Sequence, residues 1–285
     1  MCGQKKWIGI IFAGALACAH GQWLKYPSPG TPRTRDGKPN LSARAPRASK
    51  GKPDLSGLWQ AEPAPPGEIQ RLLGDVSFTV VPGDDPRTFS KYFFNLLADF
   101  KPGESPLRPE AAAELTRKRA AAQGRDDSPT THCMPIGIPR GDLFSFAPIK
   151  MIQTPGLIVM LYEVDGTHRQ VYTDGRKLPA DPQPAWLGYS VGKWEGDTLV
   201  VDTAGFNDKT WLDASGLPHS EALRVQERFR RRDFGHMEVQ VTVDDPKTFT
   251  KPFTIKFMQL LIPDSDILES FCNENEKDRA HLAGQ

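Results

Sequence analysis

The segment from Leu223 to Arg232 places one carboxylate among apolar side chains. Successive side chains of a β-strand point to opposite faces, so alternate residues of this segment form a basic face and an apolar face. Glu227 falls on the apolar face. A carboxylate there must be paired with a cation or carry a raised pKa, which makes Glu227 a candidate general acid or base. The alternative is an internal salt bridge between Glu227 and Arg231 or another arginine.

Two histidines extend the candidate chemistry. In the predicted strand 168–173, His168 lies on the same face as Tyr172. His219 falls in a predicted loop, where functional side chains are frequent. We take Glu227, His168 and His219 as the candidate catalytic residues. The residues expected to line a ligand pocket beside them are Tyr172, Tyr189, Asp202, Asn207 and Trp211.

A pocket of this kind would suit proton transfer on a small organic substrate, and the same side chains would equally orient a ligand that is only bound. Other chemistry lacks a signature. The chain has neither the G-x-S-x-G turn of many hydrolases nor a glycine-rich phosphate-binding loop. The histidines are scattered without metal-ligand spacing, so we expect no metal and no cofactor. A carboxylate pair for glycoside cleavage stays open, because the separation it needs is spatial.

The strands that must hold these side chains dominate the second half of the chain. Three strand pairs flank short polar turns, and the last turn joins a strand at 254–262 to one at 267–272. The apolar run Leu157–Tyr162 predicts a strand buried on both faces. The pattern predicts a mainly β fold, an antiparallel meander of about eight to ten strands that closes into a barrel or splits into a sandwich. No internal repeat is evident, which argues against a propeller.

The first part of the chain has a different composition. Residues 1–22 form a predicted signal peptide, 23–54 a disordered linker, and 55–285 a single β-rich domain with a helical segment at about 89–123. The linker is rich in proline and carries eight basic and two acidic residues. Such a stretch buries too little apolar surface to offset its ordering entropy. The domain carries 26 basic and 33 acidic residues, a net charge of −7, which argues against a nucleic-acid partner.

Residues 1–22 have the three parts of an export signal. Lys5 and Lys6 supply the positive start, an apolar run too short to span a bilayer follows, and small residues at Ala17–Ala19 provide a cleavage site. We therefore expect a periplasmic or extracellular protein. Cys18 also resembles the lipidated cysteine of a bacterial lipobox, so a lipid anchor is the alternative. No later stretch is long and apolar enough for a transmembrane helix.

Cleavage of the signal leaves two of the four cysteines, Cys133 and Cys272. Two thiols in an oxidising compartment usually pair, so we predict a disulfide between them. It is worth roughly 4–5 kcal/mol on the chain-entropy estimate for a loop of about 140 residues. A catalytic thiol would need a histidine base, and His132 is the chain neighbour of Cys133, where side chains tend to point apart.

Several runs of the chain resemble a family of uncharacterised secreted bacterial proteins. They are WEGDTLVV (194–201), GFNDKTWLD (205–213), HSEALR (219–224), RRRDFGH (230–236) and FCNENE (271–276). The resemblance covers most of the chain after Leu55, and it implies secretion without implying an activity. In addition, Gly57-Leu58-Trp59 is similar to the G-x-W that opens many lipocalin-like barrels, although Trp59 is equally interpreted as an ordinary core residue.

These observations lead to a leading hypothesis and two alternatives. The first is a secreted or periplasmic barrel that binds a small, partly apolar molecule. The second is an acid–base enzyme of isomerase, lyase or hydrolase type that acts on a small organic substrate in the barrel cavity. The third is a structural protein whose barrel is filled with its own side chains.

Overall fold

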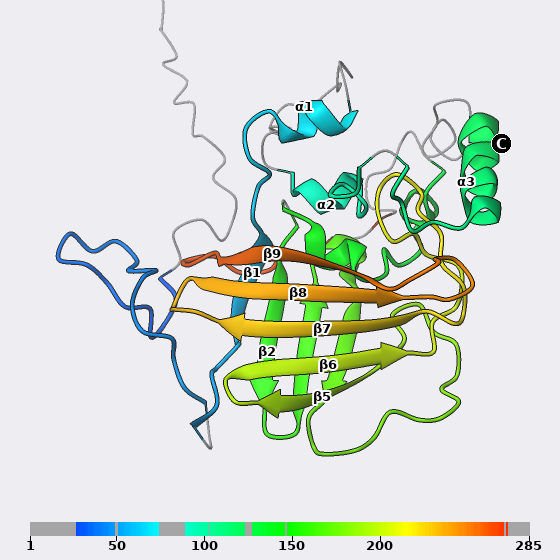
Figure 1. The fold of residues 1–285 in the computed structure, drawn as a ribbon. Helices are drawn as coiled ribbons and strands as arrows, with labels where there is room; N and C mark the ends of the chain where they lie inside the picture. Colours follow the sequence, from blue (N-terminus) through cyan, green and yellow to red (C-terminus); the bar gives the residue numbers. More distant parts are fainter. Residues whose placement is uncertain are drawn as a thin grey trace, which may run out of the picture.

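The computed structural model describes residues 27–48, 51–73, 89–101, 103–122, 127–145, 147–270 and 272. The predicted signal peptide, with Cys18, lies outside the described residues. Within them, nine strands pair in sequence order and close into a barrel (Figure 1). This confirms the mainly β fold and decides between barrel and sandwich.

The strands are short and the helices few. The strands are β1 (Gly57–Ala61), β2 (Ile149–Thr154), β3 (Leu157–Tyr162), β4 (His168–Tyr172), β5 (Tyr189–Glu195), β6 (Thr198–Ala204), β7 (Arg224–Arg231), β8 (His236–Asp244) and β9 (Phe253–Leu261). The α-helices are α1 (Glu68–Leu73), α2 (Lys91–Phe94) and α3 (Pro109–Ala122). Single 3-10 turns occur at η3 (Pro129–His132), η4 (Arg140–Leu143) and η5 (Val164–Gly166).

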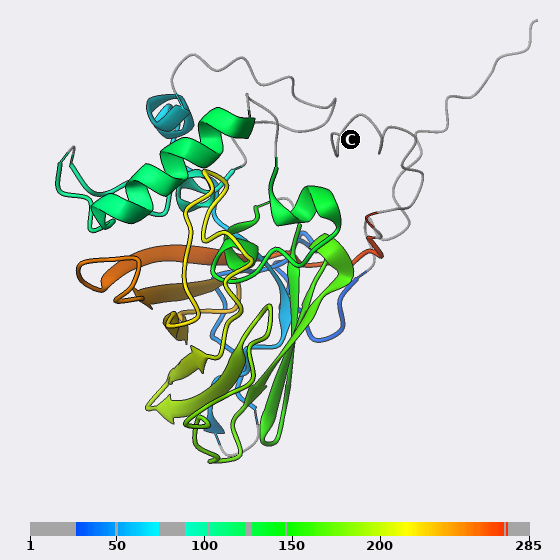
Figure 2. The same ribbon diagram turned by 90° about the vertical axis from the view of Figure 1, so that its right-hand side faces the viewer.

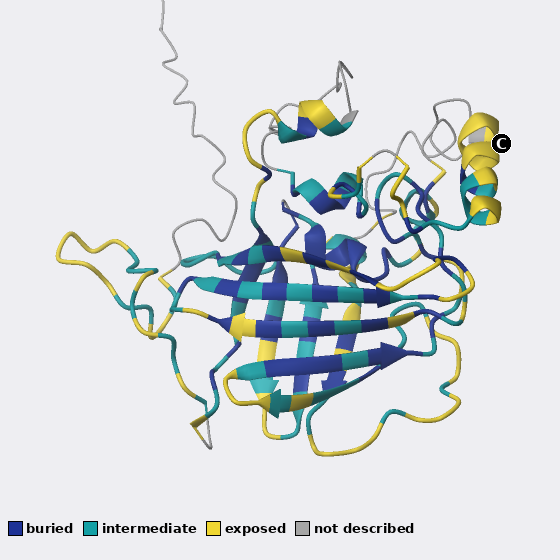
Figure 3. Ribbon diagram, viewed as in Figure 1, coloured by how far each residue is buried: buried dark blue, intermediate teal, exposed yellow. Residues whose placement is uncertain are grey.

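Alternation of side chains builds the core. Along β7 and β8, buried residues alternate with partly exposed ones, which Figure 3 shows as bands along both strands. Val225, Glu227 and Phe229 therefore point into the barrel, as the sequence pattern predicts. Val239 and Val241 of β8 lie opposite them and are buried too. The interior consequently holds apolar side chains and a few charged ones in close contact.

One pair of neighbouring strands in the barrel is parallel, and we call it the parallel joint. Every other neighbouring pair of strands is antiparallel, but β4 and β5 run in the same direction and pair only at Val171 and Tyr172 of β4. Residues 173–188 form the connection, because a parallel pair needs a crossover from one end of the barrel to the other. Residues near both ends of this crossover line surface grooves beside β4 and β5.

Three local predictions need correction. β3 alternates between buried and partly exposed residues rather than being buried on both faces, because only one of its faces meets the core. The segment 267–270 forms no strand, because β1 already pairs with the free edge of β9 and closes the barrel. The helical segment predicted at about 89–123 is not continuous, because helix within 89–101 is limited to the four residues of α2 and the longer helix is α3.

The helices gather on one side of the barrel, at the top of Figure 1 and Figure 2. Phe93 of α2 packs edge-on against Phe144, with ring centroids 4.6 Å apart. Arg119 of α3 donates hydrogen bonds of 2.8 and 2.7 Å to the carbonyl of Ser215. Among the described residues, no helix is long and apolar enough to cross a membrane.

The described part of the predicted linker is bound to the barrel. Residues 32–40 and 46–54 repeat the pattern P-R-x-x-x-G-K-P-[ND], a short repeat that the sequence analysis missed. In each copy the arginine closes its own turn by a hydrogen bond to the glycine carbonyl, Arg33 to Gly37 at 3.2 Å and Arg47 to Gly51 at 3.0 Å. We call residues 27–48 and 51–56 the N-terminal strap.

The arginine of each copy of the repeat also binds an aspartate at a turn of the barrel. Arg33 forms a two-pronged ion pair with Asp264, just after β9. Arg47 forms the same pair with Asp197 between β5 and β6, at 2.7 and 2.8 Å. Planar guanidinium groups match carboxylates in this bidentate way, so composition alone underestimates the order of this segment.

Arg231 of β7 holds the C-terminal end of the strap by hydrogen bonds. Its guanidinium lies over the ring of Trp59 at 4.8 Å and donates to the carbonyls of Asp54 and Ser56 at 2.6 and 3.2 Å. The strap also contacts the turn after β7, where the amide of Gly235 donates a 2.7 Å hydrogen bond to the carbonyl of Leu41. A Cβ added at Gly235 would lie 2.5 Å from the Cβ of Leu41.

Cys133, at the end of η3, forms a disulfide with Cys272, and their Cα atoms are 5.5 Å apart. This confirms the predicted pairing. The bond ties the segment before β2 to the chain after β9 across 139 residues.

We predict that Gly235→Ala releases the strap. The added methyl group displaces Leu41, so trypsin should cleave after Arg35 or Arg44 faster than in the wild type. Limited proteolysis with mass spectrometry measures this, and Gly235→Ala combined with Leu41→Gly should restore resistance by removing the clash. Equal cleavage of wild type and Gly235→Ala would contradict the described packing of the strap.

Candidate functional site

Glu227 is paired with an arginine that the sequence analysis did not single out. Both oxygens of Glu227 accept hydrogen bonds from Arg169 of β4, one of them at 3.0 Å. The two side chains are 0% and 1% exposed. Burial opposes the charge on Arg169, but the attraction of Glu227 outweighs it and raises the pKa of the guanidinium. Glu227 thus forms the internal salt bridge of the alternative interpretation, and its partner is Arg169 rather than Arg231, the one arginine named there.

The remaining donors of Arg169 are also used. Its Nε donates to Ser190 of β5 at 2.9 Å, and Nη2 donates to Thr203 of β6 at 2.8 Å. The Ser190 and Thr203 hydroxyls are 3.0 Å apart and bond to each other. Four strands therefore meet in one hydrogen-bonded network, and Arg169 has no strong donor left for a ligand.

A second carboxyl group belongs to the same network. Asp142 of η4 is 1% exposed, and its Oδ1 accepts a 2.9 Å hydrogen bond from the hydroxyl of Tyr162. Its Oδ2 has no hydrogen-bond partner, and the carboxyl group lies close enough to Glu227 to feel its negative charge. Burial first, and then the negative charge of Glu227, raise the pKa of Asp142 to about 8. Asp142 is therefore protonated at neutral pH, since two neighbouring buried carboxylates cannot share one arginine charge.

This interior network has the chemistry of an acid–base site without access to a substrate. The raised pKa of Asp142 favours its protonated form and Glu227 is paired with Arg169, yet both carboxyl groups are buried inside the barrel. The other candidate bases are elsewhere: His168 is exposed on the outer face of β4, and His219 lies in the loop after β6. The structure does not bring Glu227, His168 and His219 together.

His219 has a structural environment. Its Nε2 is 2.7 Å from the Thr210 hydroxyl, and its Nδ1 is 3.1 Å from the Ser220 carbonyl. The carbonyl can only accept, so Nδ1 carries the proton and Nε2 accepts from Thr210. Burial lowers the pKa of His219, which keeps the ring neutral and fixes this pattern of hydrogen bonds.

Two of the predicted ligand-binding residues lie with His219 in this loop. The Oδ1 of Asn207 accepts a 3.3 Å hydrogen bond from the Lys209 amide. The guanidinium of Arg140 lies 5.9 Å from the ring centre of Trp211. They therefore do not share a pocket with Glu227.

The other predicted residues meet on the outside of the barrel. A groove of about 460 Å³ follows the parallel β4–β5 joint and the crossover beside it. We call it the aromatic groove. Its lining includes three predicted residues, His168, Tyr172 and Tyr189, and four that were not predicted, Pro135, Thr167, Gln170 and Trp186.

The aromatic groove combines ring surfaces with polar atoms. Tyr172 and Tyr189 stack with centroids 5.3 Å apart and planes inclined by 26°. Trp186 is half-buried beside them. The Oγ1 of Thr167 is buried and has no hydrogen-bond partner. Grooves of this size with rings and a few polar atoms are typical of small-molecule sites.

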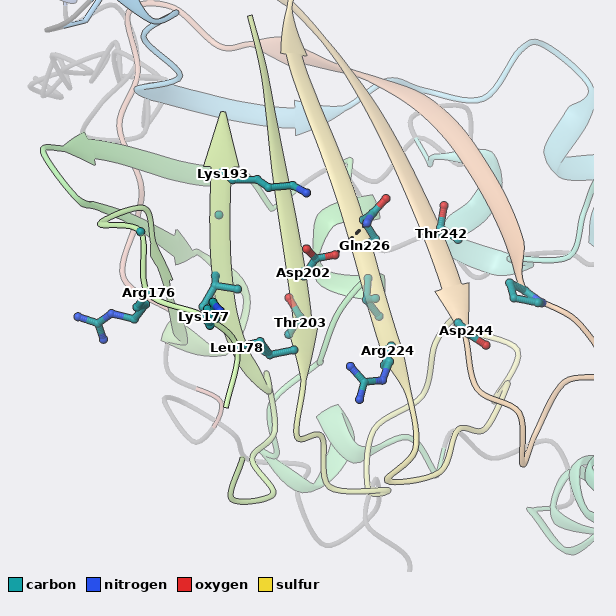
Figure 4. Close-up of a pocket in the computed structure, with 15 residues that line it drawn as sticks. Arg176, Lys177, Leu178, Lys193, Asp202, Thr203, Arg224, Gln226, Thr242 and Asp244 are labelled. Carbon is teal, nitrogen blue, oxygen red and sulfur yellow. Dashed lines mark hydrogen bonds between the residues drawn. The ribbon is translucent and has the colours of Figure 1, made fainter. Parts of the chain in front are cut away.

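Asp202, the remaining predicted residue, lines a neighbouring groove of about 650 Å³ on the outer face of β5–β8. We call it the polar groove. In Figure 4, Lys193, Asp202, Gln226 and Thr242 come from four neighbouring strands, and Arg176, Lys177 and Leu178 of the crossover border them. The amide of Gln226 donates to Asp202 at 2.8 Å.

The residues that sequence reasoning missed carry different signals. Arg169 shares a strand face with Val171, so its inward position was readable from the alternation. Asp142 lies in the single 3-10 turn η4, which is too short to show a periodic pattern of apolar residues. The sequence therefore does not reveal that Asp142 is buried. Trp186 belongs to the crossover, whose path depends on the parallel joint.

The described residues hold no cluster of three or more histidine, cysteine, aspartate or glutamate side chains that could bind a metal ion. Comparison of the chain with protein-family models, curated proteins and solved structures gives no match. The site must therefore be interpreted from its own geometry.

We predict that the raised pKa of Asp142 makes the folded protein less stable as the pH rises. The unfolded carboxyl has a pKa near 3.8. Between that value and about 8, the folded chain holds a proton that the unfolded chain has released. The free energy of unfolding therefore falls through this interval and levels off above it.

Asp142→Asn should remove this part of the decline, because asparagine mimics the protonated acid and cannot ionise. Urea unfolding between pH 5 and 8.5 measures the effect, with the exposed Asp181→Asn as the matched control. A slope that is the same in wild type and Asp142→Asn would show that Asp142 is ionised at neutral pH.

Proposed function

We propose that this protein binds a small, partly apolar molecule in the aromatic groove. The observation that supports this most strongly is the composition of the groove, with the ring of Trp186 and the edge of the Tyr172–Tyr189 stack beside the exposed polar side chains of His168 and Gln170. Aromatic rings supply contact area at low entropic cost, and a few polar atoms fix the orientation of the ligand.

The site is on the barrel surface rather than in its centre. The interior positions are filled by side chains such as Val225, Phe229 and Met237, each at most 1% exposed. The charged residues there satisfy one another through Arg169. The acid–base alternative is weakened for the same reason, because Glu227 is sealed from any substrate and separated from both candidate histidines.

Export of the protein is also a proposal. It is supported by the order of charged, apolar and small residues in 1–22, and by the resemblance to secreted bacterial proteins. The Cys133–Cys272 disulfide fits an oxidising compartment. A lipid on Cys18 is the alternative form of the same proposal, and the lipocalin-like resemblance of Gly57–Trp59 remains a proposal about kinship.

The test uses the amphiphilic dye 1-anilinonaphthalene-8-sulfonate and the variant Trp186→Ala. We expect the dye to bind the wild-type protein and to bind the variant about tenfold more weakly, because the ring surface is lost. Ile152→Ala is the matched control, since Ile152 is an exposed apolar residue of β2 that does not line the groove.

Dye binding that is unchanged in Trp186→Ala would contradict the proposal, provided that circular dichroism shows the variant folded. Mass spectrometry of small molecules that co-purify with wild type and with Trp186→Ala identifies the natural ligand. It should detect the compound in the first sample and lose it in the second.

A further inference from the structure

The polar groove has a balanced set of charges. Its basic side chains Arg176 and Lys193 both have an acidic neighbour: Arg176 bonds to Asp174 at 2.6 Å, and Lys193 lies 3.2 Å from Glu195, which Arg228 also binds at 2.9 Å. The two other basic residues of the lining, Lys177 and Arg224, are matched in number by the acidic residues Asp202 and Asp244. A groove with this balance has no preference for an anion or a cation of high charge.

The floor of the polar groove offers alternating hydrogen-bond donors and acceptors. Asp202, Gln226 and Thr242 lie directly opposite one another on β6, β7 and β8. Including Val191 of β5, this row crosses four strands, roughly 14 Å at the usual strand spacing. A ligand with many hydroxyl groups can donate to Asp202 and both donate to and accept from Gln226 and Thr242.

The two grooves meet at Arg176. Its guanidinium lies 3.8 Å from the ring centre of Tyr172, and its Nη1 donates to the Tyr189 hydroxyl at 3.1 Å. Tyr172 and Tyr189 line the aromatic groove, whereas Arg176 lines the polar groove. One cluster of three side chains therefore forms the border of both grooves, and a long ligand crossing it would contact both.

We propose that the aromatic and polar grooves form one extended site for a neutral oligosaccharide. A sugar ring has an apolar face of C–H groups, which fits beside Trp186 and the tyrosines, and a rim of hydroxyl groups, which fits the row on β6–β8. The inference rests on the proposed function, because it names the chemical class of the molecule bound in the aromatic groove.

The experiment screens the full chain on an array of neutral, acidic and amino oligosaccharides. We expect binding to neutral oligosaccharides that strengthens with length. For the best neutral sequence, isothermal titration calorimetry then compares the disaccharide with the hexasaccharide. The hexasaccharide should bind wild type about tenfold more tightly, because only the longer molecule reaches the polar groove.

Single substitutions measure how much each groove contributes to the binding affinity. Gln226→Ala should lower the affinity for the hexasaccharide about tenfold and leave the disaccharide unaffected. Trp186→Ala should weaken both. Lys256→Ala is the matched control, because Lys256 is exposed on the outer face of β9 and lines neither groove.

Binding of acidic oligosaccharides alone, binding of no saccharide, or equal affinity of the two lengths would overturn the inference. These failures differ from failure of the proposed function. If the dye still depends on Trp186 while no neutral saccharide binds, the aromatic groove remains a small-molecule site and only the ligand class is wrong. If Trp186→Ala changes neither dye nor saccharide binding, the proposed function fails as well.

Discussion

The ion pair between Arg169 and Glu227 is the interaction on which the barrel depends. The guanidinium joins β4 to β5, β6 and β7 through hydrogen bonds with Ser190, Thr203 and Glu227. This matters because β4 and β5 share the only parallel joint of the described barrel, and their main-chain pairing is limited to two positions. Side-chain hydrogen bonds inside the barrel thus supplement the β4–β5 pairing, which has few main-chain hydrogen bonds.

The same pair decides where a ligand can bind. Two buried charges must satisfy each other and fill their remaining hydrogen-bonding positions, because an unpaired charge in the core is strongly destabilising. Arg169 and Glu227 do so with side chains of the barrel itself, and protonated Asp142 completes the cluster. The charged side chains of the interior consequently stabilise the fold and are not available to a ligand. The proposed binding site is therefore on the outer surface, where residues of the crossover between β4 and β5 line two grooves together with strand residues.

Sequence periodicity predicted the parts of this protein that follow a strict alternation. Glu227 was placed on the inner, apolar face from the order of residues alone, whereas His168, expected in the same pocket, lies on the outer face. Two of the three predicted turns fall between paired strands, β5–β6 and β7–β8. The disulfide followed from counting cysteines. These inferences succeed because each depends on neighbours in the chain or on a pairing with one solution.

The failures involve contacts between distant segments. Composition predicted disorder for the strap, but Arg33 and Arg47 reach aspartates more than a hundred residues away. The salt bridge for Glu227 was expected with Arg231 or another arginine, and the sequence could not single out Arg169 because it lies on β4, far from Glu227 in the chain. His219 was a plausible base in a loop, and only the fold shows that Thr210 and Ser220 occupy both ring nitrogens.

A double-mutant cycle on Arg169→Met and Glu227→Leu tests the central claim most directly. The cycle is made in the Asp142→Asn background, because Asp142 could otherwise ionise and pair with Arg169 when Glu227 is removed. There each single substitution leaves one buried charge unpaired and should cost about 3–5 kcal/mol in the free energy of unfolding. The double substitution removes both charges while Ser190 and Thr203 remain bonded to each other, so its cost should be far smaller than the sum. The folded double variant should also keep the dye-binding affinity of the wild type. Losses that simply add, or dye binding that disappears in a folded double variant, would contradict a structural role for the pair and an external binding site.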